Sequence, residues 1–173
     1  MRFLRGLLLA ALFAWALWPE LPRYRGEHLL RGTTDMFRRL VSKPGEFENP
    51  RGALLGIEQV AFIAAAGLPG DSRSWILAGS TRLVAEEPAR ALELYREALA
   101  RGERAEIDIN MGRAYEANGE PEKARAAFLR VVWISPALFP ALLPDIQASL
   151  LAECNRLEED LRAGRLKAPP PLP

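Results

Sequence analysis

The chain has 173 residues, with 23 Lys and Arg against 22 Asp and Glu, so its net charge gives no general reason to expect nucleic acid or an acidic partner. Cys154 and His28 are its only cysteine and histidine, which excludes an intramolecular disulfide and a thiolate metal cluster. Apolar residues make up 49% and charged residues 26%, as in a folded globular protein. Ala, Leu, Glu and Arg dominate over the β-branched residues. We therefore expect an all-α fold without metal or cofactor.

The first 19 residues differ in kind from the rest. Arg2 and Arg5 precede an uncharged apolar run, Leu7–Trp18, which is typical of a secretory signal. We expect residues 1–19 to be a signal peptide or a membrane anchor; Ala14–Ala16 offers a cleavage site, and the run is short of the ~20 residues that a membrane span needs. A buried core helix is the alternative. Arginines after the run favour a cytoplasmic body, but we favour export, with an inner-membrane-associated, periplasmic domain in a bacterium.

Residues 20–70 are expected to form a helical N-terminal buttress. Glu27–Val41 has apolar residues at near-helical spacing, and residues 42–52 contain turn-forming Pro-Gly and Asn-Pro pairs that predict a loop. Ala53–Ala66 is a strongly apolar helix, which we expect to be buried in the core rather than in lipid.

From Asp71 onward the pattern becomes regular. Helix caps, prolines and the Asn118-Gly119 stop predict successive helices, which we place at about 71–86, Ala89–Ala100, Ala105–Ala117 and Pro121 to Pro136. Residues 139–164 are expected to contain a capping helix with a charged face, and residues 165–173 a proline-rich tail.

Several residues recur at a single offset of 33. The pairs are Ile76 and Ile109, Gly79 and Gly112, Pro88 and Pro121, Ala91 and Ala124, and Tyr95 and Phe128. In each copy, the glycine would let two helices approach closely, and the aromatic residue would fill the space between them. The chain is therefore predicted to contain a repeated helical hairpin, which needs stacked neighbours to bury its apolar face.

The repeat resembles the tetratricopeptide repeat (TPR), whose pattern is Trp-x-x-Leu-Gly-x-x-Tyr, then Ala-x-x-x-Phe, then Pro, over about 34 residues. The second copy has Met111, Gly112, Tyr115, Ala124, Phe128 and Pro136, but has Asp108 in place of the tryptophan. The first copy has Trp75, Gly79, Ala91 and Tyr95, but departs from the pattern at Ala78, Arg82 and Glu103. The resemblance covers two repeats over residues 71–138. A third, degenerate copy before Asp71 is left open.

TPR modules bind other proteins or peptide segments in a groove lined by the first helix of each repeat, and the resemblance implies the same here. The groove would present Arg73, Ile76, Ser80, Leu83, Glu106, Ile109, Asn110, Arg113 and Glu116. The alternative for each of these residues is ordinary solvated helix surface. Some family members hold a carboxylate with an asparagine at the place of Asn110, but no flanking basic partners support that here. Trp133 is a candidate interface anchor, or else packs against the final helix.

Other functions have little support in the sequence. Ser72 and Ser74 have no histidine nearby, and the acidic neighbours of Cys154 should raise its thiol pKa, so we do not expect an enzyme. The basic stretch after the apolar run fits anionic lipid headgroups better than nucleic acid. We expect a non-enzymatic protein–protein interaction scaffold, as an accessory subunit of a cell-envelope assembly. The alternative is a structural subunit that self-associates into a homo-oligomer.

Overall fold

The computed structural model describes residues 12–13, 15–18, 20–165, 168 and 170–173, and in this part of the chain every regular element is helical. The all-α prediction is confirmed. The elements are α2 (Glu20–Ser42), η1 (Pro44–Glu46), α3 (Pro50–Gly67), α4 (Arg73–Val84), α5 (Pro88–Leu99), α6 (Ala105–Ala117), α7 (Pro121–Ile134), η2 (Pro136–Ala141) and α8 (Pro144–Arg162).

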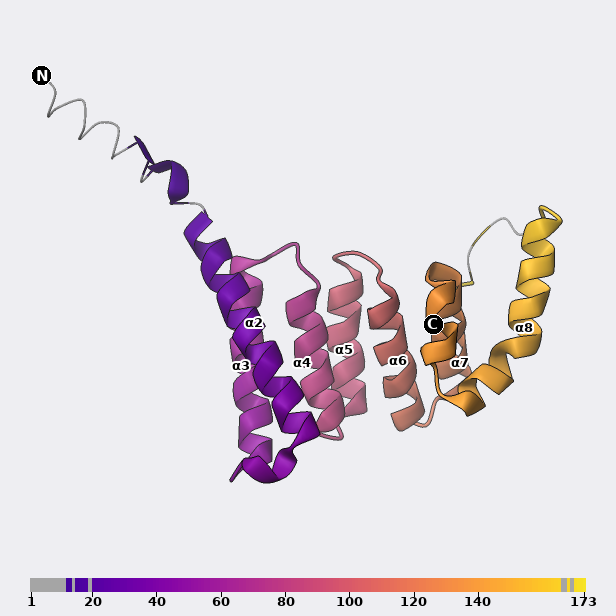
Figure 1. Cartoon of the computed structure of the whole chain (residues 1–173), viewed down its shortest axis with the longest axis horizontal. Coiled ribbons are helices and arrows are strands. Elements are labelled where there is room, and N and C mark those ends of the chain that lie inside the picture. Colours follow the sequence, from indigo (N-terminus) through magenta and orange to yellow (C-terminus); the bar gives the residue numbers. More distant parts are fainter. Residues whose placement is uncertain (1–11, 14, 19, 166–167, 169) are drawn as a thin grey trace, which may run out of the picture.

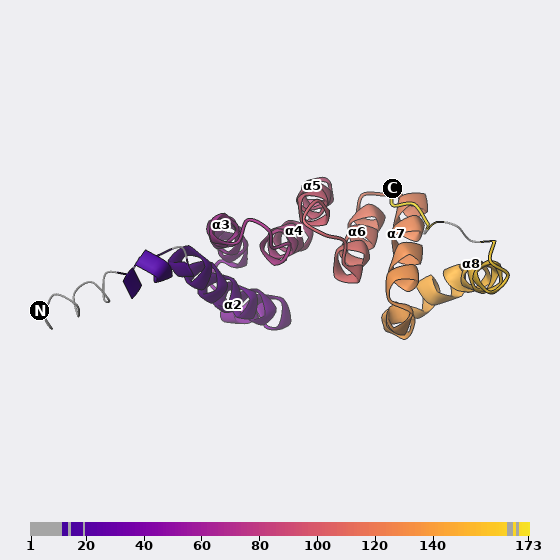
Figure 2. The same cartoon turned by 90° about the horizontal axis from the view of Figure 1, so that it is seen from above.

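The helices α3 to α7 stand in a row, each packed against the next along the chain, and α2 lies across one side of the row (Figures 1 and 2). Two hairpins, α4–α5 and α6–α7, make up this row from α4 onward. This arrangement is a helical-repeat-like fold, in which most contacts are between elements that follow one another along the chain. The buried apolar residues form two clusters along the row.

The two hairpins share one internal contact. A Cβ atom added to Gly79 would lie 2.5 Å from Cε1 of Tyr95, and one added to Gly112 would lie 2.5 Å from Cε1 of Phe128. Both aromatic side chains are buried. The predicted pairing of a small residue on the first helix with an aromatic ring on the second is therefore confirmed, because only glycine leaves room for the ring.

A further hairpin, α2–α3, precedes these two. Here the close approach is between Gly67 and Pro22, whose carbonyl oxygen would lie 2.5 Å from an added Cβ atom. The apolar side of α3 is buried between α2 and α4, as predicted for this helix. Its buried apolar members are Leu54, Ile57, Ala61, Ala64 and Ala65. All of these except Ala65 join Leu30, Leu40, Leu77 and Leu94 in one cluster.

The loop predicted for residues 42–52 is shorter than expected. η1 occupies part of it, and α3 begins at Pro50, three residues before the predicted Ala53. The Asn49 side chain caps this helix by accepting a hydrogen bond from the Gly52 amide at 2.8 Å. The Asn-Pro pair indicates a helix start here, because asparagine is a strong N-cap and proline fits the first helical position.

The C-terminal end of the row is less closely packed. α8 buries Ile146 and Leu150, but its second half diverges from α7 (Figure 1). Leu151 and Leu161 are exposed on it. The chain then returns, and its last four residues lie beside α7 (Figures 1 and 2).

The predicted signal or anchor, residues 1–19, lies mostly outside the described residues. Those of its side chains that are described and apolar are strongly exposed, with Trp15 at 77% and Trp18 at 73%. Of the helices in the described part of the chain, none combines the length and the hydropathy that a membrane span requires.

Candidate partner-binding groove

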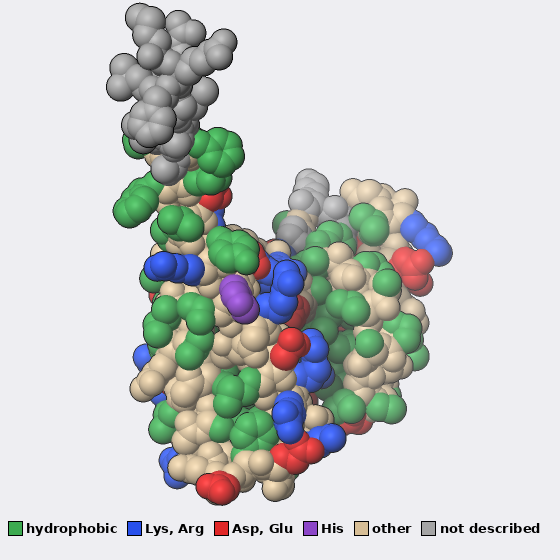
Figure 3. Space-filling view, turned by 60° about the vertical axis from the view of Figure 1, so that its left-hand side comes forward, with side chains coloured by type: hydrophobic (Ala, Val, Ile, Leu, Met, Phe, Trp, Pro, Cys, Tyr) green, Lys and Arg blue, Asp and Glu red, His purple; other side chains and the backbone are tan. Residues whose placement is uncertain are grey.

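A groove of about 390 Å³ lies between α2 and the first helices of the two hairpins, α4 and α6. Its apolar lining comes from Leu30 and Phe37 of α2 and from Ile76 and Leu77 of α4. Figure 3 shows a column of basic and acidic side chains running down this face next to α2, with hydrophobic side chains beyond it. The polar lining residues are Glu27, Arg31, Thr34, Asp35, Arg38, Arg73, Ser80, Arg104 and Glu106.

The structure brings part of the predicted site into this groove. Arg73, Ile76, Ser80 and Glu106 line it directly. On α6, Asn110 is half-buried, while Arg113 and Glu116 are exposed beyond the lining residues. The other two predicted members, Leu83 and Ile109, are half-buried and pack against the apolar core. Trp133 is half-buried on α7.

Arg73 is engaged within the chain. Its guanidinium pairs with Glu27 of α2 and with Asp71 just before α4. The hydrogen bonds from Arg73 lower the pKa of Asp71 below its ordinary value. The Arg73 side chain therefore joins α2 to α4 at one end of the groove. Two other arginines of the groove, Arg31 and Arg104, form no ion pair with any described residue. These two can neutralise an acidic group of a ligand.

The other end of the groove face is acidic. Burial raises the pKa of Glu116, the carboxylate of Asp145 raises it further, and Arg113 opposes both effects. The charge of Arg113 therefore acts on Glu116 in the direction opposite to that of Asp145, but does not cancel the rise in its pKa. The groove face thus has basic side chains next to α2 and a mixed, more acidic cluster where α6 approaches the start of α8.

Sequence reasoning missed the wall that α2 contributes. The repeat pattern covers α4 to α7, whereas α2 carries no copy of it in register. The sequence predicts that these residues form a helix. It does not predict on which side of the row this helix lies, because the tertiary packing of α2 on α3 determines that side.

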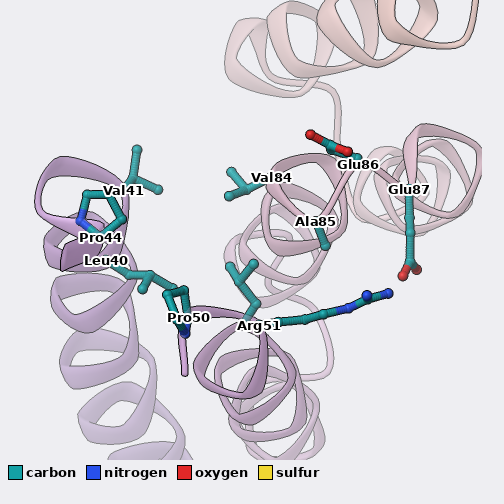
Figure 4. A pocket seen from close by; sticks show the side chains of 10 residues that line it. Leu40, Val41, Pro44, Pro50, Arg51, Val84, Ala85, Glu86 and Glu87 are labelled. Carbon is teal, nitrogen blue, oxygen red and sulfur yellow. The ribbon is translucent and has the colours of Figure 1, made fainter. Parts of the chain in front are cut away.

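A second hollow, also missed, lies where the turn between α4 and α5 meets the end of α2 (Figure 4). It has a volume of about 670 Å³ and apolar walls from Leu40 and Val41 on one side and Val84 on the other. Arg51 extends along it toward Glu87 (Figure 4). Glu87 is already paired with Arg82.

Other titratable groups lie outside the groove. Among the described residues, no three His, Cys, Asp or Glu side chains come together as a metal site would need. Burial, followed by the charge of Glu153, raises the pKa of the Cys154 thiol, in the predicted direction. Asp108 is fully buried on α6, where neither of its carboxylate oxygens has a described hydrogen-bond partner, and desolvation raises its pKa to about 7.

Comparison of the chain with protein-family models, curated proteins and solved structures finds no match. The fold and the groove are therefore interpreted from this chain alone.

Proposed function

We propose that this protein is a non-enzymatic scaffold of the TPR type that binds a segment of another protein in the groove between α2, α4 and α6. The main support for this proposal is the chemistry of the groove. It combines an apolar lining with charged side chains along its edges, which is the chemistry that holds an amphipathic helix or an extended peptide.

The repeated contacts support the TPR assignment. Gly79 with Tyr95 and Gly112 with Phe128 occupy the family's glycine and aromatic positions and make the same interhelical contact. Pro88 and Pro121 stand at the first position of α5 and α7. The two hairpins are thus equivalent in structure as well as in sequence spacing.

The charges suggest which segment would fit. Arg31 and Arg104 line the groove without a described ion-pair partner, and Arg113 stands next to acidic side chains at the far end. We infer a partner segment with apolar residues on one face, acidic residues facing α2, and a carboxylate or carbonyl facing Arg113.

Reversal of one charge on α6, next to the residues that line the groove, tests the proposal. Arg113→Glu should weaken capture of the partner at least tenfold, with unchanged helix content by circular dichroism. Arg90→Glu on α5 is a matched control, because Arg90 is also exposed and also has a glutamate three residues later, Glu93. Partner capture by photo-crosslinking from Ser80, identified by mass spectrometry, supplies the binding measurement. Equal capture by both variants would remove the groove from the proposal.

We also propose that the apolar N-terminal segment directs the protein to the inner membrane, with the helical row on the periplasmic side, as part of a cell-envelope assembly. The exposed Trp15, Leu17 and Trp18 support this, because such side chains are stable at a membrane interface. Replacing these three with Asp should move the protein from the membrane fraction to the soluble fraction. A reporter that is active only outside the cytoplasm, fused after Pro173, tests the side.

Self-association has less support. The apolar helix that suggested it, α3, buries its apolar face against α2 and α4 within one chain. A mass that rises with protein concentration would favour the homo-oligomer over the scaffold.

A further inference from the structure

The C-terminal residues 170–173 (Pro-Pro-Leu-Pro) are seated on the side of the row opposite α2 (Figure 2). Arg130 of α7 donates a hydrogen bond from Nη1 to the Pro170 carbonyl oxygen at 2.8 Å. Tyr115 of α6 donates from its hydroxyl group to the backbone oxygen of Pro173 at 3.3 Å. Both ends of this short segment are therefore held by side chains of the second hairpin.

The chemistry of the two donors matches that of the segment. Proline has no backbone N–H, so Pro170, Pro171 and Pro173 offer only hydrogen-bond acceptors. The site offers only donors at the two contacts, a guanidinium and a phenol. Because proline-rich segments favour the extended polyproline II conformation even when free, they lose little entropy on binding.

Both donors are also held by contacts with residues other than the segment. Glu103 accepts hydrogen bonds from Nε and Nη2 of Arg130, which leaves Nη1 for the Pro170 carbonyl. The Tyr115 side chain is 1% exposed, and Arg96 donates to its hydroxyl oxygen at 3.4 Å, so the phenolic hydrogen is directed to a different acceptor. A preorganised pair of donors reduces the entropic cost of holding a ligand.

The prolines of the segment lie next to a partly apolar hollow. A hollow of about 470 Å³ lies between α7 and the diverging α8, and Pro170 and Pro171 form part of its wall together with Ala126, Leu129 and Leu157. Pro170 is buried there. Pro170 thus lies at the wall of a partly apolar hollow that α8 leaves open, while Pro171 is exposed at its edge.

We propose that this surface, which we call the proline site, with Tyr115, Arg130 and the apolar edge of α7 as its members, binds extended proline-rich segments, and that residues 170–173 are its resident ligand. The proline site is separate from the groove and does not depend on the function proposed for the groove. A partner with a proline-rich segment would bind it by displacing the chain's own tail.

The first test uses a fluorescent peptide with the sequence of residues 168–173, Ala-Pro-Pro-Pro-Leu-Pro. A full-length variant with Ser in place of Pro170, Pro171, Leu172 and Pro173 loses the polyproline preference and the apolar side chains of the tail, which weakens its hold on the proline site. This vacated variant should bind the peptide, as measured by fluorescence anisotropy. The unmodified chain should bind it about tenfold more weakly, because a tethered tail competes at an effective concentration in the millimolar range. A peptide with Ala in place of every Pro is the control and should not bind.

Two substitutions in the vacated variant locate the binding. Tyr115→Phe keeps the ring and removes one donor, so the affinity for the peptide should fall about fivefold. Arg130→Gln should reduce it further, and Arg113→Glu beside the groove should leave it unchanged. Melting temperatures confirm that each variant is folded. The proposal is overturned if the folded, vacated variant does not bind the peptide, if Tyr115→Phe binds it as tightly, or if Arg113→Glu abolishes binding.

Discussion

The hairpins α4–α5 and α6–α7 have the same internal contact but differ where they meet their neighbours. Arg82 in the first stands at the place of Tyr115 in the second, 33 residues later. Arg82 pairs with the buried Glu58 of α3 and with Glu87, whereas Tyr115 is buried, with a hydroxyl group that reaches the tail. The comparison indicates that glycine and aromatic residues fix each hairpin, while contacts between hairpins are free to diverge.

Two residue differences between the repeats, at equivalent positions, account for this divergence. Glu58 on α3 is 33 residues before Ala91 on α5, so a buried glutamate replaces a buried alanine on the helix that precedes each hairpin. The Glu58 side chain is only 6% exposed, and Arg82 supplies the charge that it needs. The arginine is thus a departure from the repeat pattern that the neighbouring helix compensates.

Among the substitutions that test this difference between the hairpins, removal of the Arg82 side chain should change the stability most. Arg82→Met leaves Glu58 buried without its partner, and we expect a loss of about 3 kcal/mol in the free energy of unfolding, measured by urea denaturation at pH 7. The double variant Glu58→Ala and Arg82→Tyr copies the second hairpin and should recover more than half of that loss. A loss below about 0.5 kcal/mol for Arg82→Met would identify the pair as an ordinary surface ion pair.

Asp108 provides the next test, because it stands at the place of Trp75 in the first hairpin. Trp75 packs against Phe62 and lies under Arg101, while Asp108 is a buried carboxyl group with a pKa of about 7 against an ordinary 3.8. The folded state holds the Asp108 proton to a higher pH than the unfolded state does. Stability should therefore fall as pH rises from about 4 to about 7.

Asp108→Asn removes this dependence without a change of shape. We expect the variant to be more stable than the original chain by about 2 kcal/mol at pH 8 and equally stable near pH 4, from urea denaturation at several pH values. A difference between the two proteins that does not change with pH would show that Asp108 is not the group that titrates.

The shared contact should be broken by the smallest possible side chain. Gly79→Ala and Gly112→Ala each place a methyl group against an aromatic ring, and we expect a loss of about 2 kcal/mol from overpacking in each hairpin. Gly56→Ala in α3 is the control, because nothing lies within 4 Å of its added Cβ atom. That variant should gain about 0.5–1 kcal/mol from helix propensity. Thermal denaturation of the three variants gives the order of their stabilities. A loss of stability for only one of Gly79→Ala and Gly112→Ala would contradict the equivalence of the two hairpins.

Much of the fold could be predicted because its signals are local. Prolines at helix starts, the glycine and aromatic positions and the stop at Gly119 define α5, α6 and α7 within a few residues. The partners of polar groups could not be predicted, because they carry no periodic signal. Glu58 lies 24 residues from Arg82, and Pro173 lies 58 residues from Tyr115. The packing of α2 beside α4 also has no periodic signal in the sequence. The predicted groove residues therefore came from α4 and α6 and included none from α2.

The turns of the two hairpins give the smallest predicted effect. Gly119 adopts a positive φ of 74° after α6, and Glu86, at the equivalent place after α4, adopts a φ of 61°. A non-glycine residue in this left-handed region is strained, whereas glycine is not. Glu86→Gly should therefore raise the free energy of unfolding by about 0.5–1 kcal/mol, and Gly119→Ala should lower it by about 1 kcal/mol, both measured by urea denaturation.

Glu86 forms no ion pair with any described residue, so its replacement removes strain rather than a contact. Glu86→Ala separates the two effects, because it deletes the charge and keeps the strained backbone; it should leave stability within about 0.3 kcal/mol of the original. If Glu86→Ala stabilised the chain as much as Glu86→Gly, the charge and not the backbone would be responsible. The strain at Glu86 would then offer no explanation for the difference between the two turns.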